Sequence, residues 1–158
     1  MSRKRCAIPF FMPRPKSDMP SSSDTPPGWE PIRDSGFIAH VGPVFRRADG
    51  AYAFRASEKH ANLIRVVHGG MLMSFADRAL GETAMASADG ANCVTVQMEM
   101  QFLDAARLGD WIEARPEVLR RTGSMVFLRT DLLVGERRVA YASGVWKILR
   151  RRPDAEGA

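Results

Sequence analysis

Between residues 71 and 88, apolar side chains recur at steps of three and four positions, which is the spacing of one face of an α-helix. Almost every residue of this stretch is small or a good helix former. The stretch from Asn62 to Ala88 therefore reads as a polar approach followed by one long helix. Its apolar face would carry Leu72, Phe75, Ala76, Ala79, Leu80, Thr83 and Ala84.

After the helix, the period of the pattern changes to two, as expected for strands with one buried face. In the run from Cys93 to Phe102, an apolar face (Val94, Val96, Met98, Met100, Phe102) alternates with a polar face (Thr95, Gln97, Glu99, Gln101). Glycine-containing turns separate three further predicted strands, over residues 111–121 with a bulge at Pro116, 125–134 and 138–149.

Before the helix, Asp49-Gly50 lies between apolar runs at residues 37–47 and 51–54, which is typical of a β-hairpin. Residues 29–34 are expected to form a capping segment or a turn of helix. A hairpin, one long helix and a four-strand meander predict the α+β class, with an antiparallel sheet wrapped around a central helix.

The start of the helix and one acid within it are the candidate chemistry. Gly69-Gly70 leaves the first backbone N–H groups of the helix open to an anion or a developing oxyanion. Asp77 follows seven residues later inside an apolar run, where a charge requires a reason. His40, His60 and Cys93 show no metal-ligand spacing, so no metal site is expected.

The chain ends differ in composition from the body. Of the formal net charge of +5, residues 1–27 carry +3 and residues 150–158 carry +1, which argues against nucleic-acid binding by the body. Residues 1–27 are rich in proline and serine, so disordered ends flank one predicted domain over 28–149. Two cysteines and no apolar run of membrane length favour a cytoplasmic protein. Translation can start at Met1, Met12 or Met19.

Together, Asn62, His68-Gly69-Gly70 and Asp77 resemble the hotdog-fold acyl-CoA thioesterases, and most closely the phenylacetate-degradation (PaaI) type. The later segments R-R-T-G-S and V-A-Y-A-S-G-V-W-K-I-L are also similar to the closing strands of that family, so the resemblance covers roughly residues 28–149. It implies hydrolysis of an acyl-CoA without a metal or redox cofactor, coenzyme A being part of the substrate.

The resemblance also suggests roles for individual residues. Asp77 would act as general base, or less simply as a nucleophile; Gly69 would donate to the oxyanion; Asn62 and His68 would orient water or brace the loop. Substrate contacts are expected from Gly70, Thr95, Arg120, Arg121 and Ser124, the arginines meeting the phosphates of coenzyme A.

Each of these residues can also have a purely structural role. His68 alone can fill a polar niche, Asn62 can be a local cap, and Asp77 can pair with Arg78 or Arg65. Thr95 can be a plain strand threonine, and Arg120 and Arg121 solvated charges at a strand end.

Helix geometry adds an expectation about assembly. His68 and Asp77 are nine residues apart, so their backbones lie roughly 12–14 Å apart. A two-fold dimer that pairs one chain's Asp77 with its partner's Gly69 would solve this separation, and the resemblance suggests a dimer of dimers. Alternative functions on this fold are a hydratase or dehydratase, and a non-catalytic acyl-CoA-binding module. The acyl group and the pathway stay open.

Overall fold

The computed structural model describes residues 25–149. Its elements, in chain order, are β1 (Trp29–Pro31), α1 (Gly36–Val41), β2 (Phe45–Arg47), β3 (Tyr52–Arg55), the 3-10 turn η2 (Glu58–His60), α2 (Gly69–Ser87), β4 (Cys93–Phe102), β5 (Trp111–Ala114), β6 (Glu117–Arg121), β7 (Met125–Val134) and β8 (Arg137–Ile148). The predictions made for residues 1–24 and 150–158, including those about the tails and the translation start, lie outside the described residues.

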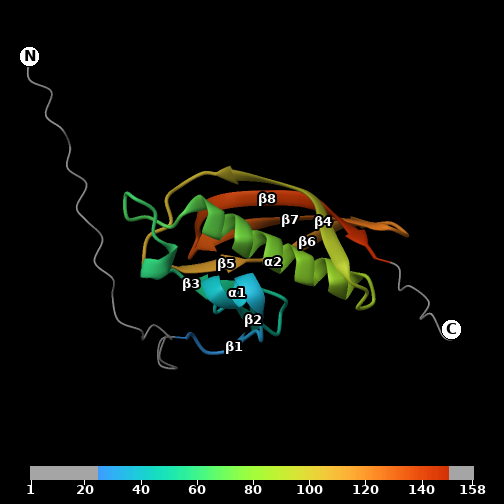
Figure 1. The fold of residues 1–158 in the computed structure, drawn as a ribbon, viewed down its shortest axis with the longest axis horizontal. Helices are drawn as coiled ribbons and strands as arrows, with labels where there is room; N and C mark the ends of the chain where they lie inside the picture. The colour runs from blue at the N-terminus through green and yellow to red at the C-terminus, as the bar shows by residue number, and fades with distance from the viewer. Residues whose placement is uncertain (1–24, 150–158) are drawn as a thin grey trace, which may run out of the picture.

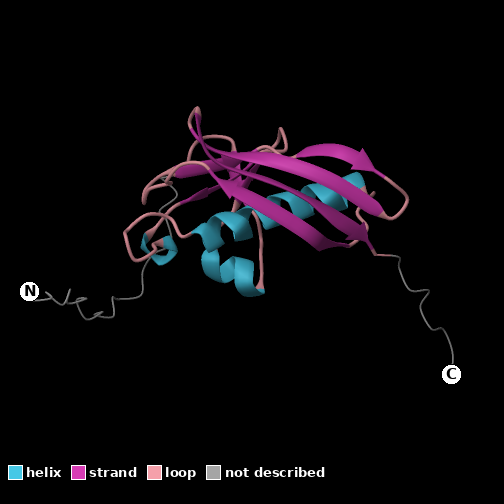
Figure 2. Cartoon of the chain, turned by 90° about the horizontal axis from the view of Figure 1, so that it is seen from above, coloured by secondary structure: helices cyan, strands magenta, loops and turns pink. Residues whose placement is uncertain are grey.

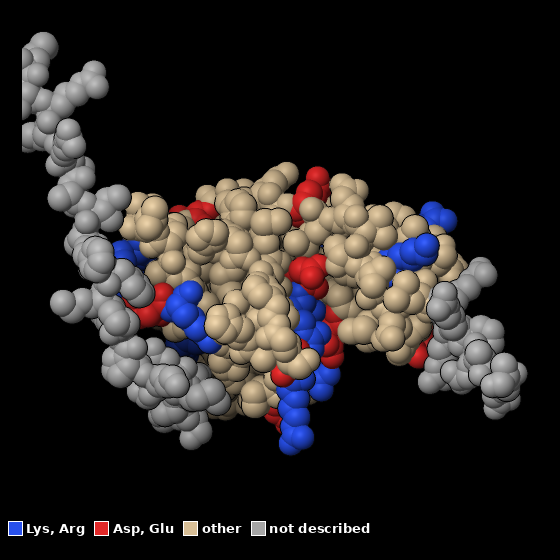
Figure 3. Space-filling model, in the orientation of Figure 1, with Lys and Arg blue, Asp and Glu red and all other residues tan. Residues whose placement is uncertain are grey.

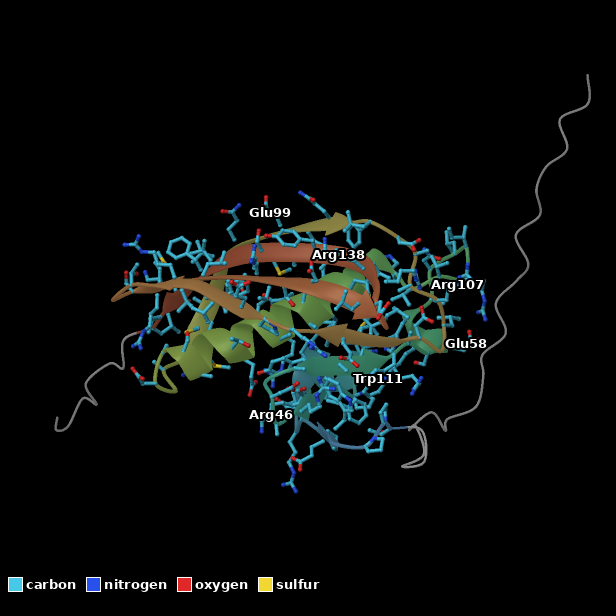
Figure 4. All side chains as sticks on the ribbon, turned by 180° about the vertical axis from the view of Figure 1, so that it is seen from behind. Arg46, Glu58, Glu99, Arg107, Trp111 and Arg138 are labelled. Carbon is cyan, nitrogen blue, oxygen red and sulfur yellow. The ribbon has the colours of Figure 1, made fainter. Side chains whose placement is uncertain are left out.

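The strands form one antiparallel sheet in the order β1-β2-β3-β5-β7-β8-β4, with β6 paired to β7 off this path. α2 lies along one face of the sheet, and the long strands curve around it (Figures 1 and 2). Figure 4 looks onto the sheet from the opposite side, where Glu99 and Arg138 stand on a face that no described helix covers. The predicted α+β architecture is confirmed.

The apolar face of α2 supplies the centre of the core. Phe75, Ala76, Ala79, Leu80 and Ala84 are fully buried, and the alanines allow the helix to lie close to the strands. The Phe75 ring contacts a phenylalanine of β3 at a centroid distance of 4.8 Å. Burial of a Leu or Phe side chain contributes about 1.5–3 kcal/mol. The buried face is the one predicted from the sequence, except that Met71 joins it and Thr83 is only half-buried.

Two elements that precede α2 differ from the sequence prediction. Residues 29–31, expected in a capping segment or helix turn, form the strand β1, which pairs with β2. Of the run 37–47, expected to be a strand throughout, only Phe45–Arg47 is one, because Gly36–Val41 forms the helix α1. The hairpin turn at Asp49-Gly50, which joins β2 to β3, is confirmed.

Contacts from a distant turn hold α1 in its helical form. Lys59 donates to the carbonyl of His40 at 3.2 Å, and His60 donates from Nε2 to the carbonyl of Val41 at 2.7 Å. Carbonyls at the end of a helix otherwise lack partners. The Nδ1 atom of His60 accepts the Ser57 N–H at 2.9 Å, so the ring is neutral, and burial lowers the pKa of His60. A local sequence pattern carries no sign of these bonds.

The predicted strand over residues 111–121 is two strands. β5 ends at Ala114 and pairs with β3 and β7, whereas β6 begins at Glu117 and pairs with β7 alone. Pro116 lies in the break. Because proline has no N–H to donate to a neighbouring strand, it interrupts the ladder rather than only bulging it.

β4 has the predicted bounds but not the predicted faces. A bulge lies between Thr95 and Gln97, and the extra residue turns Thr95 toward α2, the side on which Met98 packs against the core. Val94 and Val96, expected on the buried face, are 44% and 57% exposed. The period-two pattern therefore predicted the strand correctly, but for the residues up to the bulge it predicted the wrong side chains to face the core.

Candidate functional site

The amino-terminal end of α2 presents a backbone donor. His68 is the N-cap, and its Nδ1 accepts the Gly70 N–H at 2.8 Å. Among the described residues, no hydrogen bond uses the N–H of Gly69. A Cβ on Gly69 would lie 3.1 Å from the ring of Phe102, so glycine allows close packing here. His68 thus makes the local polar contact of the simpler interpretation. In the described part of the chain, the neighbouring N–H of Gly69 is left without a partner at a half-buried position beside a cavity, which suits an anion.

Asn62 braces the loop that leads into α2. Its Oδ1 accepts the N–H groups of Ile64 at 3.0 Å and Val66 at 3.2 Å, and its own N–H donates to the carbonyl of Val66 at 2.8 Å. Arg65, between them, adopts a φ of 67°, which is unusual for a residue other than glycine. In the single chain Asn62 therefore acts as a local cap, the alternative that the sequence left open.

Asp77 is joined to β4 by a short hydrogen bond. The hydroxyl of Thr95 donates to Oδ1 of Asp77 at 2.6 Å. Bonds from a hydroxyl to a carboxylate at this distance are among the stronger ones in proteins. The plain strand threonine favoured from the sequence is thus not what the structure shows, because the bulge in β4 turns this side chain toward α2.

Neither arginine considered as a structural partner of Asp77 binds it. Arg78 donates to Asp34 at 2.8 Å and to Glu82, while Arg65 pairs with a glutamate of η2 at 2.6 Å. Burial disfavours the charge of Arg78, but the bonds to Asp34 and Glu82 outweigh it and raise the pKa of this guanidinium. Within the described part of the chain, Asp77 takes part in no ion pair.

Gly69 and Asp77 line two separate cavities. Gly69 and Phe102 line one of about 330 Å³ at the start of α2, and Asp77 and Thr95 line one of about 320 Å³ farther along the helix. Eight helical residues span about 12 Å. One chain therefore does not bring the predicted oxyanion donor and the predicted base together.

Arg78, together with residues that the sequence did not connect with Asp77, completes its cavity. They come from α2, β4 and β8, and are Arg78, Gly81, Glu82, Met85, Cys93, Val94 and Trp146. Gly81 follows Asp77 by one helical turn, a signal that the sequence contained. Trp146 had no such signal, because its place opposite α2 depends on the pairing of β8 with β4.

The residues predicted to meet the phosphates of coenzyme A do not converge in the single chain. Arg120 and Arg121 are consecutive residues of β6, so their side chains leave opposite faces of the sheet. Arg121 donates to Asp89 at 2.7 Å, and Ser124 lies exposed in the turn before β7. Their role in substrate binding stays a prediction.

Several wider features of the described residues bear on function. Residues 25–149 include no cluster of three or more His, Cys, Asp and Glu side chains that could hold a metal ion. None of their helices is both long enough and apolar enough to span a membrane. On the face drawn in Figure 3, acidic (red) and basic (blue) side chains adjoin one another, and most of the surface of the described residues is uncharged (tan).

Comparison with known proteins gives a consistent family. Residues 65–141 match the profile of the thioesterase superfamily. A Pseudomonas aeruginosa protein named a putative esterase is 37% identical over 131 residues, covering 79% of this chain and 98% of the relative.

Solved structures agree. A mutant of the phenylacetic acid degradation protein PaaI from Thermus thermophilus superposes with a TM-score of 0.62 at 25% identity, covering 72% of this chain and 98% of that one. A hypothetical thioesterase from Streptococcus pneumoniae, solved with coenzyme A, has a TM-score of 0.60 at 21% identity, covering 65% and 82%; at this identity it shows the fold alone. The chain therefore belongs to the thioesterase superfamily and is a thioester hydrolase of the hotdog fold.

Proposed function

We propose that this enzyme hydrolyses acyl-CoA thioesters, with Asp77 activating the attacking water. The observation that carries the proposal is the setting of Asp77: a carboxylate on an apolar helix, aligned by the Thr95 hydroxyl at 2.6 Å and free of ion pairs within residues 25–149. A carboxylate held in this way keeps its second oxygen for a proton. Coenzyme A as the carrier is supported by the fold neighbour solved with coenzyme A.

The proposed reaction has two steps. Water attacks the thioester carbonyl while Asp77 takes its proton, and the carbonyl oxygen becomes an oxyanion bound by the N–H of Gly69. The C–S bond then breaks, and Asp77 returns the proton to the leaving sulfur. The products are the carboxylic acid and free coenzyme A. Attack by Asp77 itself, through an anhydride, is the alternative route.

The edge of the sheet at β4 supports a dimer. β4 pairs with β8 on one side, and no described strand pairs with its other edge. This long edge exposes apolar side chains, with Val96 57% and Phe102 53% accessible. An uncovered edge of this length and character is a template for another strand. We infer that the β4 strand of a second copy pairs with it, in line with a two-fold dimer.

Antiparallel pairing of two β4 strands would also complete the site. Phe102 lies at one end of β4, beside Gly69, and Thr95 lies near the other end, bonded to Asp77. A two-fold axis near the middle of the strand places the Thr95 end of one copy beside the Phe102 end of the other. Each dimer would then contain two sites, each built from Asp77 of one protomer and Gly69 of its partner. Back-to-back association of two such dimers remains a further proposal.

The test is release of free thiol from acyl-CoAs that carry phenylacetyl, short straight, medium straight or aromatic acyl groups. The wild type is expected to hydrolyse one class, and Asp77→Asn to lower kcat by at least about 10²-fold, the usual contribution of a general base. Asp131→Asn removes a carboxylate from the outer sheet face and should keep wild-type turnover. Binding of acyl-CoA without turnover by the wild type would instead indicate a non-catalytic binding module.

A further inference from the structure

Trp146 lies beside the reacting groups although it belongs to the last strand. In the register of β4 and β8 it is the direct partner of Thr95, whose hydroxyl binds Asp77. Its side chain is only 1% exposed and forms part of the core, yet it lines the Asp77 cavity. Trp146 therefore forms part of the floor of that cavity.

The indole nitrogen of Trp146 is a donor without a partner. Within residues 25–149, no hydrogen bond involves Nε1 of Trp146. The Nε1 atom of Trp111 is also unpaired, but protein atoms enclose it completely, whereas Nε1 of Trp146 is not fully enclosed. Buried indole N–H groups usually find an acceptor. An unpaired donor that borders a cavity next to the reacting groups suits an acceptor on a ligand.

Gly81 leaves this donor uncovered. It lies inside α2, one turn or about 6 Å beyond Asp77, where glycine is unfavourable for the helix. A Cβ on Gly81 would lie 3.5 Å from Nε1 of Trp146, which is ordinary van der Waals contact. Alanine would therefore fit here, and the consequence of glycine is that no methyl group lies against the indole nitrogen.

We propose that the N–H of Trp146 determines specificity, by selecting short acyl groups that carry a hydrogen-bond acceptor near their far end. This inference rests on the proposed thioesterase function. The cavity wall includes Met85, Cys93 and Val94, which suit the hydrocarbon part of an acyl group. Gly81 lies against the indole nitrogen, and the helical rise of about 6 Å from Asp77 to Gly81 corresponds to roughly five bonds of an extended chain. A ketone or hydroxyl oxygen at that depth would accept from Trp146 while the thioester lies at Asp77.

The experiment compares matched pairs of acyl-CoAs. Each pair has a methyl ketone at the next-to-last carbon in one member and a methyl branch in the other, for chains of about four to seven carbons. In the wild type, kcat/KM is expected to favour the ketone roughly three- to tenfold at one chain length, because the branched acyl group leaves the donor unpaired.

Three variants assign the preference to the indole N–H. Trp146→Phe removes the donor, and Gly81→Ala covers it; both should bring the ratio within a pair to about one. Trp111→Phe is the matched control, since it removes an indole N–H far from the cavity, and it should keep the wild-type ratio. Gly81→Ala introduces no void, so it decides the question even where Trp146→Phe fails to fold.

The outcomes separate the two proposals. Thiol release with equal rates within every pair, or a ketone preference that survives Gly81→Ala and Trp146→Phe, overturns the role of Trp146 and leaves the thioesterase function standing. No thiol release by the wild type from any acyl-CoA overturns both.

Discussion

Two inactive variants of this enzyme should restore each other when they are combined in one dimer. Asp77→Asn keeps the shape of the side chain but removes the proposed base. Gly69→Val places a branched side chain where even a Cβ would lie 3.1 Å from the ring of Phe102, so it displaces the oxyanion donor. Each variant alone should lose nearly all turnover, because every site in its homodimer carries the same defect.

The expected recovery follows from the proposed geometry. About 12 Å of helix separates Gly69 from Asp77, so each site takes one of the two residues from each protomer. In a mixed dimer one site then collects both defects and the other collects none. Random reassociation makes half of the dimers mixed, so turnover should return to about a quarter of the wild-type value. Mixed dimers purified through two different tags should show about half.

The assay is thiol release after the two variants are unfolded and refolded together, compared with each variant refolded alone. A matched control mixes Asp77→Asn with Thr95→Val: both defects lie on the same half of the site, so no intact site can form and turnover should stay low. Purified mixed dimers of Asp77→Asn and Gly69→Val with only background activity would refute the shared site.

Two further predictions concern the Thr95 bond and the buried histidine. Thr95→Val removes a hydrogen bond to Asp77 worth about 1.5–3 kcal/mol, so kcat should fall roughly 10- to 100-fold. In the control Thr83→Val, the lost hydroxyl binds only the helix to which it belongs, so kcat should change less than about twofold. Equal effects of the two variants on kcat would contradict the role given to Thr95. His60 has a folded-state pKa below its unfolded value near 6.5, since burial disfavours its charge and Nδ1 already accepts the Ser57 N–H. The unfolded chain therefore binds more protons below about pH 6.5, and the free energy of unfolding should fall on acidification through that value. Denaturant titrations at about pH 7.5 and 5.5 should show a smaller difference for His60→Gln than for the wild type; an unchanged difference would assign the pH dependence to other groups.

The features that could be predicted from the sequence are those that depend on residues close together in the chain. The helix of α2 and its buried face follow from side chains three and four positions apart. The bounds of β4 follow from a period of two, and those of β7 from the glycine-containing turns on either side of it. The glycines at the start of α2 and the isolated Asp77 are also local signals. Where a long-range contact decides the structure, the local signal failed: α1 depends on bonds from Lys59 and His60.

By itself, then, the sequence determined the fold class, the central helix and the pair of residues, Gly69 and Asp77, around which the chemistry is proposed. The tertiary structure alone decided which side chains surround them. One inserted residue in β4 turned Thr95 toward Asp77, and the register of β4 with β8 put Trp146 beside Thr95. A bulge and a strand register have little energetic signature in the local sequence, because they are set by the packing of strands against one helix.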